Sequence, residues 1–127
     1  MAVRDGSRCS VELAGDLSEV ARARARTREQ LQEWRLGDLA VTAELVVSEL
    51  VTNALRHGTG PVWMVLHYDG ALRIEVGDAS HEPPLLVPPH LDGTSGRGLA
   101  LVDALAAKWG TQHHSAGKTV WAEIVLD

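Results

Sequence analysis

The chain has 127 residues and 45% of them are hydrophobic, which is enough for one domain with its own core. One cysteine excludes an internal disulfide, and no apolar run suits a signal peptide or reaches the roughly 20 residues of a membrane span, so we expect a cytoplasmic protein. The net charge of -5, without a Lys/Arg block, disfavours direct nucleic-acid binding.

The N-terminal third of the chain predicts a strand followed by a helix. Val11 and Leu13 alternate with polar residues, which predicts a strand over residues 10–14. Ser18 is expected to cap a helix that extends to about Trp34 and is stopped by Gly37. Four arginines of this helix alternate with alanine, at positions 22, 24, 26 and 28. A solvated helix exterior is the favoured interpretation, and a basic surface for an acidic partner stays open.

A second helix and a hairpin follow. Asp38 is expected to cap a helix over residues 39–57, whose apolar residues recur at the spacing of one buried face: Leu39, Ala43, Val46, Val47, Leu50 and Ala54. Residues 61–68 predict a strand, and Asp69 with Gly70 predicts a hairpin turn. The return strand carries alternating apolar residues at positions 72, 74 and 76.

The last third begins with a long irregular stretch. Residues 79–97 contain four prolines and no periodicity, and loops of this length are usually functional or disordered. A helical pattern resumes over residues 98–107, and closing strands are predicted around Trp109 and over residues 119–126. We therefore expect an α+β domain, a sheet covered by helices on one face.

Three polar positions are candidates for chemistry. Glu49 and Asn53 lie one helical turn apart at the margin of the apolar stripe, where a carboxylate needs a donor or a cation. From spacing alone an ordinary surface pair is the favoured interpretation. Asp78 has two interpretations: the strand continues and the carboxylate faces the core, ready to accept a ligand amine, or the strand ends at Gly77 and Asp78 caps a turn.

A glycine-rich segment precedes the third predicted helix. Gly93, Gly96 and Gly98 enclose Ser95 and Arg97. Backbone N–H groups and the helix dipole at such a position favour an anion, and a plain flexible loop is the equally weighted alternative. The histidines show no metal-binding spacing, and the four tryptophans are expected to fill the core.

Taken in order, four segments resemble the ATP-binding domains of the histidine-kinase-like (GHKL) ATPase superfamily. They are residues 44–58 (ELVVSELVTNALRHG), 76–80 (VGDAS), 93–110 (GTSGRGLALVDALAAKWG) and 117–123 (GKTVWAE). The most similar branch is the bacterial anti-sigma-factor serine/threonine kinases. The resemblance implies one domain over residues 1–127 with the Bergerat-type α/β sandwich, a mixed, mostly antiparallel sheet and an ATP lid at about residues 79–97.

The resemblance also implies roles for single residues. Glu49 would be the general base, Asn53 would bind Mg²⁺ through its amide oxygen, and Asp78, supported by Thr119, would accept from the adenine amino group. Further nucleotide contacts are implied for Arg56, His57, Gly93, Ser95, Gly96, Arg97, Gly98 and Leu99.

By the same resemblance the chain would phosphorylate an anti-sigma-factor antagonist on serine or threonine and sequester a sigma factor, with ATP and Mg²⁺, and a homodimer is expected by analogy. The sequence departs from the superfamily after Asp78, where Ala79 and Ser80 replace a glycine pair. This departure motivates the alternative of a non-catalytic ATP-binding regulatory module. A third interpretation is the ATPase domain of a larger signalling protein.

Overall fold

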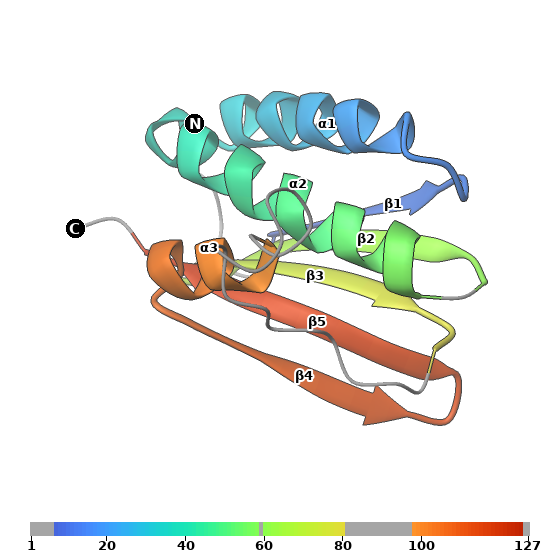
Figure 1. Ribbon diagram of the computed structural model, residues 1–127. Coiled ribbons are helices and arrows are strands. Elements are labelled where there is room, and N and C mark those ends of the chain that lie inside the picture. The colour runs from blue at the N-terminus through green and yellow to red at the C-terminus, as the bar shows by residue number, and fades with distance from the viewer. Residues whose placement is uncertain (1–6, 59, 81–97, 126–127) are drawn as a thin grey trace.

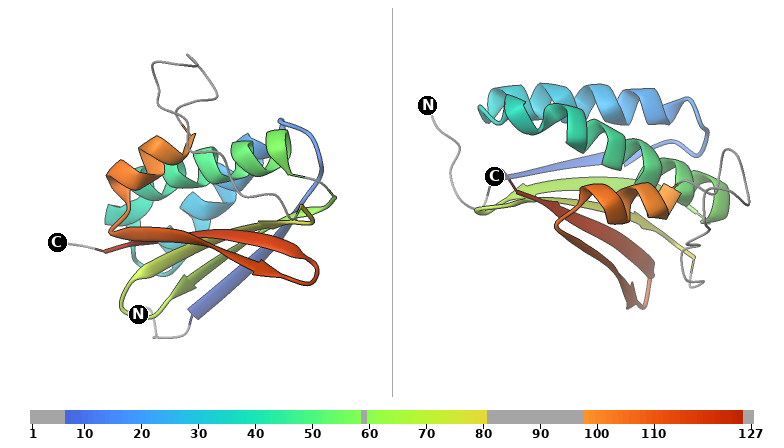
Figure 2. Two further views of the ribbon diagram at one scale, coloured as in Figure 1. Left: turned by 60° about the horizontal axis from the view of Figure 1, so that its bottom comes forward. Right: turned by 60° about the vertical axis from the view of Figure 1, so that its left-hand side comes forward.

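The computed structural model describes residues 7–58, 60–80 and 98–125, which form two layers (Figure 1). One layer is a five-stranded sheet and the other is made of helices, all on the same face of the sheet (Figure 2, left). In chain order the elements are β1 (Ser7–Leu13), α1 (Glu19–Glu33), the 3-10 turn η1 (Gly37–Leu39), α2 (Ala40–His57), β2 (Val62–Tyr68), β3 (Leu72–Asp78), α3 (Gly98–Leu105), β4 (Lys108–His114) and β5 (Gly117–Ile124).

The sheet has the strand order β1-β2-β3-β5-β4, and all four of these pairings are antiparallel. The expected α+β sandwich with a mostly antiparallel sheet is therefore confirmed. Strands β2 and β3 form the predicted hairpin, in which Tyr68 pairs with Leu72. The edge strand β4 is mostly polar, and the sequence predicted it only around Trp109; pairing with β5 extends it to seven residues.

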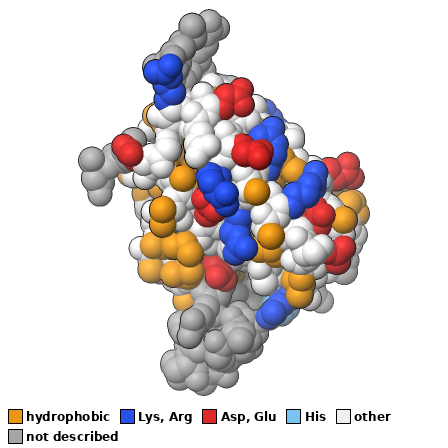
Figure 3. All heavy atoms as spheres, turned by 90° about the horizontal axis from the view of Figure 1, so that it is seen from above, with side chains coloured by type: hydrophobic (Ala, Val, Ile, Leu, Met, Phe, Trp, Pro, Cys, Tyr) orange, Lys and Arg blue, Asp and Glu red, His pale blue; other side chains and the backbone are white. Residues whose placement is uncertain are grey.

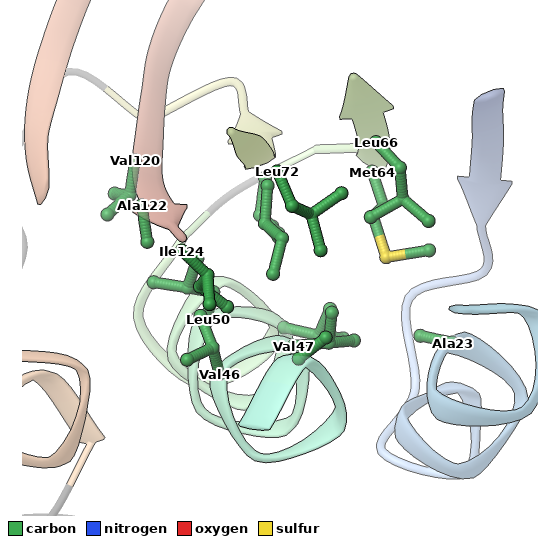
Figure 4. Packing of buried hydrophobic residues seen from close by; sticks show 14 of the residues in the cluster. Ala23, Val46, Val47, Leu50, Met64, Leu66, Leu72, Val120, Ala122 and Ile124 are labelled. Atoms are coloured by element: carbon green, nitrogen blue, oxygen red, sulfur yellow. The ribbon is translucent and has the colours of Figure 1, made fainter. Parts of the chain in front are cut away.

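The core lies between α2 and the inner face of β3 and β5. Leu72, Ile74 and Val76 of β3 are paired with Ile124, Ala122 and Val120 of β5, and all six side chains are buried. Val46, Val47 and Leu50 of α2 point toward this face, and Met64 and Leu66 of the neighbouring strand β2 extend the face toward α1 and α2 (Figure 4). The apolar stripe predicted for the second helix is thus the stripe that packs on the sheet.

Helix α1 ends at an arginine in the left-handed region, and the prediction that Gly37 stops it was wrong. Arg35 has φ 60°, its N–H donates to the Gln32 carbonyl at 3.1 Å, and the Leu36 N–H donates to the Leu31 carbonyl at 2.7 Å. These two bonds are the pattern in which a helix usually ends at glycine. Gly37 instead begins the short 3-10 turn.

The predicted helix caps differ as well. Ser18 is at the cap position of α1, as expected, but it has a helical conformation and makes no side-chain cap hydrogen bond; its N–H donates to the Asp16 carboxylate at 2.9 Å. Asp38 lies inside the 3-10 turn, and Leu39 occupies the cap position of α2 without a side-chain hydrogen bond. Local turns formed before each helix therefore replace the single-residue caps that we expected.

The outer surface of α1 and α2 carries interspersed basic and acidic side chains (Figure 3). Arg28 donates two hydrogen bonds to Glu44 of α2, both at 3.1 Å, and Arg24 donates to Ser48 at 3.2 Å. The hydrogen bond with Glu44, and then the charge of Glu44, raise the pKa of Arg28. The arginines of α1 thus lie on a solvated helix exterior. No helix in the described ranges combines the length and hydropathy needed to cross a membrane.

Candidate functional site

The buried carboxylate of Asp78 lies at the end of the central strand β3. The strand continues through Gly77, so Asp78 follows Leu72, Ile74 and Val76 onto the core face, and only 1% of the residue is exposed. Of the two interpretations that the sequence left open, the inward-facing carboxylate is confirmed. A buried carboxylate is costly unless donors surround it, and the surrounding residues supply three hydrogen bonds.

Lys118 provides two of these hydrogen bonds. Asp78 and Lys118 are directly opposite each other in the β3–β5 ladder, and the lysine Nζ lies 3.1 Å from Oδ1 and 3.0 Å from Oδ2. Both side chains are buried, at 2% and 3% exposure. The Ser80 backbone N–H donates the third bond, to Oδ1 at 2.7 Å. The apolar ladder of the core therefore ends in a buried ion pair.

Two glycines allow the backbone to close around Asp78. A Cβ atom at Gly58, just after α2, would lie 2.5 Å from the Asp78 Cγ and 2.6 Å from Oδ2. At Gly117 the chain has φ 146°, and a Cβ there would lie 2.6 Å from the Ala79 Cα. The carboxylate is thus held between the C-terminal end of α2 and the start of β5.

Thr119 lies on the other face of the sheet. Because side chains alternate along β5, its hydroxyl points away from Lys118, and it lies 3.2 Å from the Nε2 of His114 on β4. We expected Thr119 to support Asp78, but the structure places Lys118 in that position. On the same open face the ring of Trp63 covers Gly77, and its centroid lies 6.3 Å from that of His114.

The candidate residues Glu49 and Asn53 share one flank of α2. A helix turns about 100° per residue, so Glu49 and Asn53 lie on a different flank from Glu44 and Ser48, which contact α1. Glu49 and Asn53 are both half-buried. Helix α3 packs against α2 on the side away from α1 (Figure 1). Arg56 and His57, in the last turn of α2, are exposed.

Helix α3 has its C-terminal end at the opposite end of the sheet from Asp78. After α3 the chain enters β4 at Lys108, which pairs with Glu123 of β5, five residues beyond Lys118. The N-terminal end of α3, at Gly98, therefore points toward the end of the sheet where Asp78 lies. Leu99 is buried in the core, at 1% exposure of the residue, so its side chain packs against the sheet and helices. The other predicted residues of the glycine segment, Gly93, Ser95, Gly96 and Arg97, lie outside the described residues.

The residue that the sequence analysis missed is Lys118. Lysine is rarely buried, so its position in the GKTVWAE segment attracted no separate interpretation. A usable signal was nevertheless present, because Lys118, Val120, Ala122 and Ile124 share the even spacing of the buried face of β5. In the described ranges no group of three or more His, Cys, Asp or Glu residues forms a metal-binding cluster.

This arrangement is suited to an elongated polar ligand. A carboxylate held by fixed donors can accept a hydrogen bond from an amine, and an amide oxygen is a hard ligand of the kind that Mg²⁺ prefers. On α2, Asn53 and Glu49 lie about 7 Å and 13 Å along the helix axis from Gly58, which touches Asp78. Asp78, the candidate amine acceptor, therefore lies beside the C-terminal end of α2, and Asn53, the candidate metal ligand, lies further back along that helix.

Comparison with known proteins identifies the family and the fold of this chain. The family model described as "Histidine kinase-like ATPase domain" matches residues 13–124. No curated protein matches the sequence significantly. A solved structure, the RsbU and RsbW domains of Rv1364c from Mycobacterium tuberculosis, is similar with a TM-score of 0.67 and 24% identity over 94% of this chain. The match spans only 32% of that protein's chain, so the present chain corresponds to about a third of it. The chain belongs to the family of histidine kinase-like ATPase domains.

Proposed function

We propose that this chain binds ATP with Mg²⁺ and is an anti-sigma-factor serine/threonine kinase, which phosphorylates an antagonist protein and sequesters a sigma factor. The observation that carries the proposal is the buried Asp78 carboxylate beside the end of α2, in a chain of the histidine kinase-like ATPase family. A cytoplasmic location is part of the proposal.

The side chains fit the proposed nucleotide. Counting donors from the described residues, about one lone pair of Asp78 is left for a further donor, on Oδ2, because Oδ1 already accepts from Ser80 and Lys118. With the adenine amino group at Asp78, the phosphates would extend along α2 past Asn53 toward Glu49. The N-terminal end of α3 would add backbone N–H groups for phosphate oxygens.

Each residue of α2 then has a separate task. Asn53 would hold Mg²⁺ through its amide oxygen, and the ion would offset charge on the phosphate oxygens. Glu49 would orient the hydroxyl group of the partner's serine or threonine and accept its proton. Its half-buried position favours this role, since partial exclusion of water strengthens a hydrogen bond to the incoming hydroxyl group.

Two measurements test the proposal. Calorimetric titration with ATP should show Mg²⁺-dependent binding to the wild type, and Asn53→Ala should lose the dependence on Mg²⁺. Absence of nucleotide binding by the wild type would remove the proposal.

Transfer of labelled phosphate to a candidate antagonist should be lost in Glu49→Gln and kept in Glu44→Gln, a matched control on the flank of α2 that faces α1.

A second candidate function is a regulatory module that binds nucleotide without transferring phosphate. The observation that favours it is the turn after Asp78, where Ala79 and Ser80 replace the glycine pair and the Ser80 N–H is committed to Asp78. In that case Glu49→Gln would bind ATP and regulate its partner like the wild type. Loss of partner regulation in Glu49→Gln would favour the kinase. The similarity to part of a multidomain chain keeps the third interpretation, a domain of a larger signalling protein, among the proposals.

A further inference from the structure

The buried ammonium of Lys118 has a donor to spare. An ammonium group has three N–H donors, and within the described part of the chain the acceptors of Lys118 are the two oxygens of Asp78. The side chain is 3% exposed, so bulk water has little access to the group. A ligand that reaches Asp78 thus meets an acceptor and a donor side by side.

Stability alone gives a weak reason for this pair. The neighbouring positions of the same ladder are filled by Val76 and Val120, and a further apolar pair would continue the core. Replacing a buried ion pair by apolar residues of similar volume is often neutral or stabilising. The pair lies where the ladder leaves the apolar core and meets the end of α2, with Gly58 and Gly117 closing on Asp78.

We propose that Lys118 is a specificity-determining residue that reads the base of the nucleotide together with Asp78. In this arrangement, which rests on the proposed function, Asp78 accepts from the 6-amino group of adenine. Lys118 donates its third N–H to the ring nitrogen next to that amino group, either N1 or N7. A 6-amino purine has the amino group, a donor, beside a ring nitrogen, an acceptor. If the ring nitrogen is removed, the third N–H of the Lys118 ammonium has no hydrogen-bond acceptor on the base.

The experiment compares ATP with three analogues in which one ring nitrogen is replaced by CH. The analogues are 1-deaza-ATP and 7-deaza-ATP, which lack a nitrogen beside the amino group, and 3-deaza-ATP, the matched control on the far side of the ring. By calorimetry with Mg²⁺, the wild type should bind either the 1-deaza or the 7-deaza compound about tenfold more weakly than ATP. It should bind 3-deaza-ATP like ATP.

The variant that isolates Lys118 is the double substitution Asp78→Asn/Lys118→Met. It avoids the unpaired buried carboxylate that Lys118→Met alone would leave, and the Asn amide oxygen still accepts from the amino group. In this variant ATP and all three analogues should bind with similar affinity. Circular dichroism checks that it is folded; if it is not, Lys118→Gln, which keeps a neutral donor for Asp78, takes its place and should discriminate less than the wild type.

The outcomes separate the two proposals. A wild type that binds no nucleotide overturns the proposed function and this inference together. A wild type that binds ATP and all three analogues equally leaves ATP binding intact and overturns the role of Lys118. Discrimination that persists unchanged in the folded variant also overturns it, because another donor would then read the ring nitrogen.

Discussion

At the scale of single residues, the site depends on two glycines, Gly58 and Gly117, because a Cβ atom at either position would overlap with atoms of Asp78 or Ala79. The two glycines beside Asp78 leave space that no other residue would leave, and for Gly117 the backbone conformation adds a second requirement. A φ of 146° lies in the region that residues with a Cβ rarely adopt. The identity of this residue is therefore set by backbone geometry and by packing together.

Replacing Gly117 by alanine should destabilise the fold strongly. The new Cβ would meet the backbone of Ala79, which cannot move aside as a flexible side chain can, and we expect a loss of about 2–4 kcal/mol in the free energy of unfolding. Urea denaturation followed by circular dichroism measures the change. Gly15→Ala is the control, because nothing lies within 4 Å of its Cβ position, and it should change stability by no more than about 0.5 kcal/mol.

The end of α1 offers a change in the opposite direction. Arg35 is exposed and occupies the left-handed position that favours glycine, so Arg35→Gly should stabilise the protein by about 1 kcal/mol. The melting temperature measured by calorimetry should rise by a few degrees. Arg26→Gly, inside the helix, is the control and should lower it. A decrease in Arg35→Gly would mean that the arginine side chain has a stabilising role.

At the scale of elements, hydrophobic periodicity predicted the helices and strands whose apolar faces form the core, and it missed features that depend on pairing between strands. The apolar stripe of α2 and the alternation in β3 were enough to place both elements. The strand β4 is mostly polar and becomes a strand because β5 pairs with it. Lys118 shows the same limit in its partner: spacing along β5 places it on the buried face, but its contact with Asp78 joins segments 40 residues apart in sequence.

The residues of the candidate site show the same difference between patterns within one element and contacts between elements. Glu49, Asn53 and Asp78 were proposed from their spacing and from the order of the segments, and each lies within one regular element; their roles stay predictions. The role of Thr119 was assigned from its segment, and alternation along β5 gives the inward position to the residue before it. Of the predicted helix caps, Ser18 is at the cap position of α1 but makes no side-chain cap hydrogen bond. The cap predicted for Asp38 was wrong, since Asp38 lies inside a 3-10 turn that a rule for single residues does not describe.

Helix α2 packs one face on the sheet. Substitution of a buried and an exposed leucine of this helix tests which face is buried. Leu50 is 2% exposed and points into the core, so Leu50→Ala should cost about 2–5 kcal/mol of unfolding free energy. Leu45, on the outer surface of the same helix, is 44% exposed, and Leu45→Ala should cost less than about 1 kcal/mol. Equal losses in urea denaturation would contradict the orientation of α2.

At the scale of the whole molecule, the helices cover one face of the sheet and leave the site at one end of the sandwich (Figure 2). The contacts at that end come from α2, β3 and β5, segments that are distant in the sequence. A ligand bound there would contact elements from most of the chain and should stabilise the fold as a unit.

Mg-ATP should therefore raise the melting temperature of the whole domain. At a concentration of one hundred times the dissociation constant, the gain is about 2.7 kcal/mol, or roughly 10 °C for a chain of this size. Differential scanning calorimetry measures the shift, which EDTA should reduce and Asn53→Ala should make independent of Mg²⁺. An unchanged melting temperature at saturating Mg-ATP would contradict binding to the folded state.

The indole ring of Trp63, which covers Gly77 on the open face of the sheet, gives the protein its own optical reporter. Gly77 is covalently joined to Asp78, and the ring also lies beside His114, so a ligand that repositions Asp78 alters the surroundings of the fluorophore through a single strand. Because Trp63 faces away from the helices, it is not in the ligand's path. Association and release can thus be followed in real time by tryptophan emission, without a label, and Trp63→Leu identifies its share of the signal.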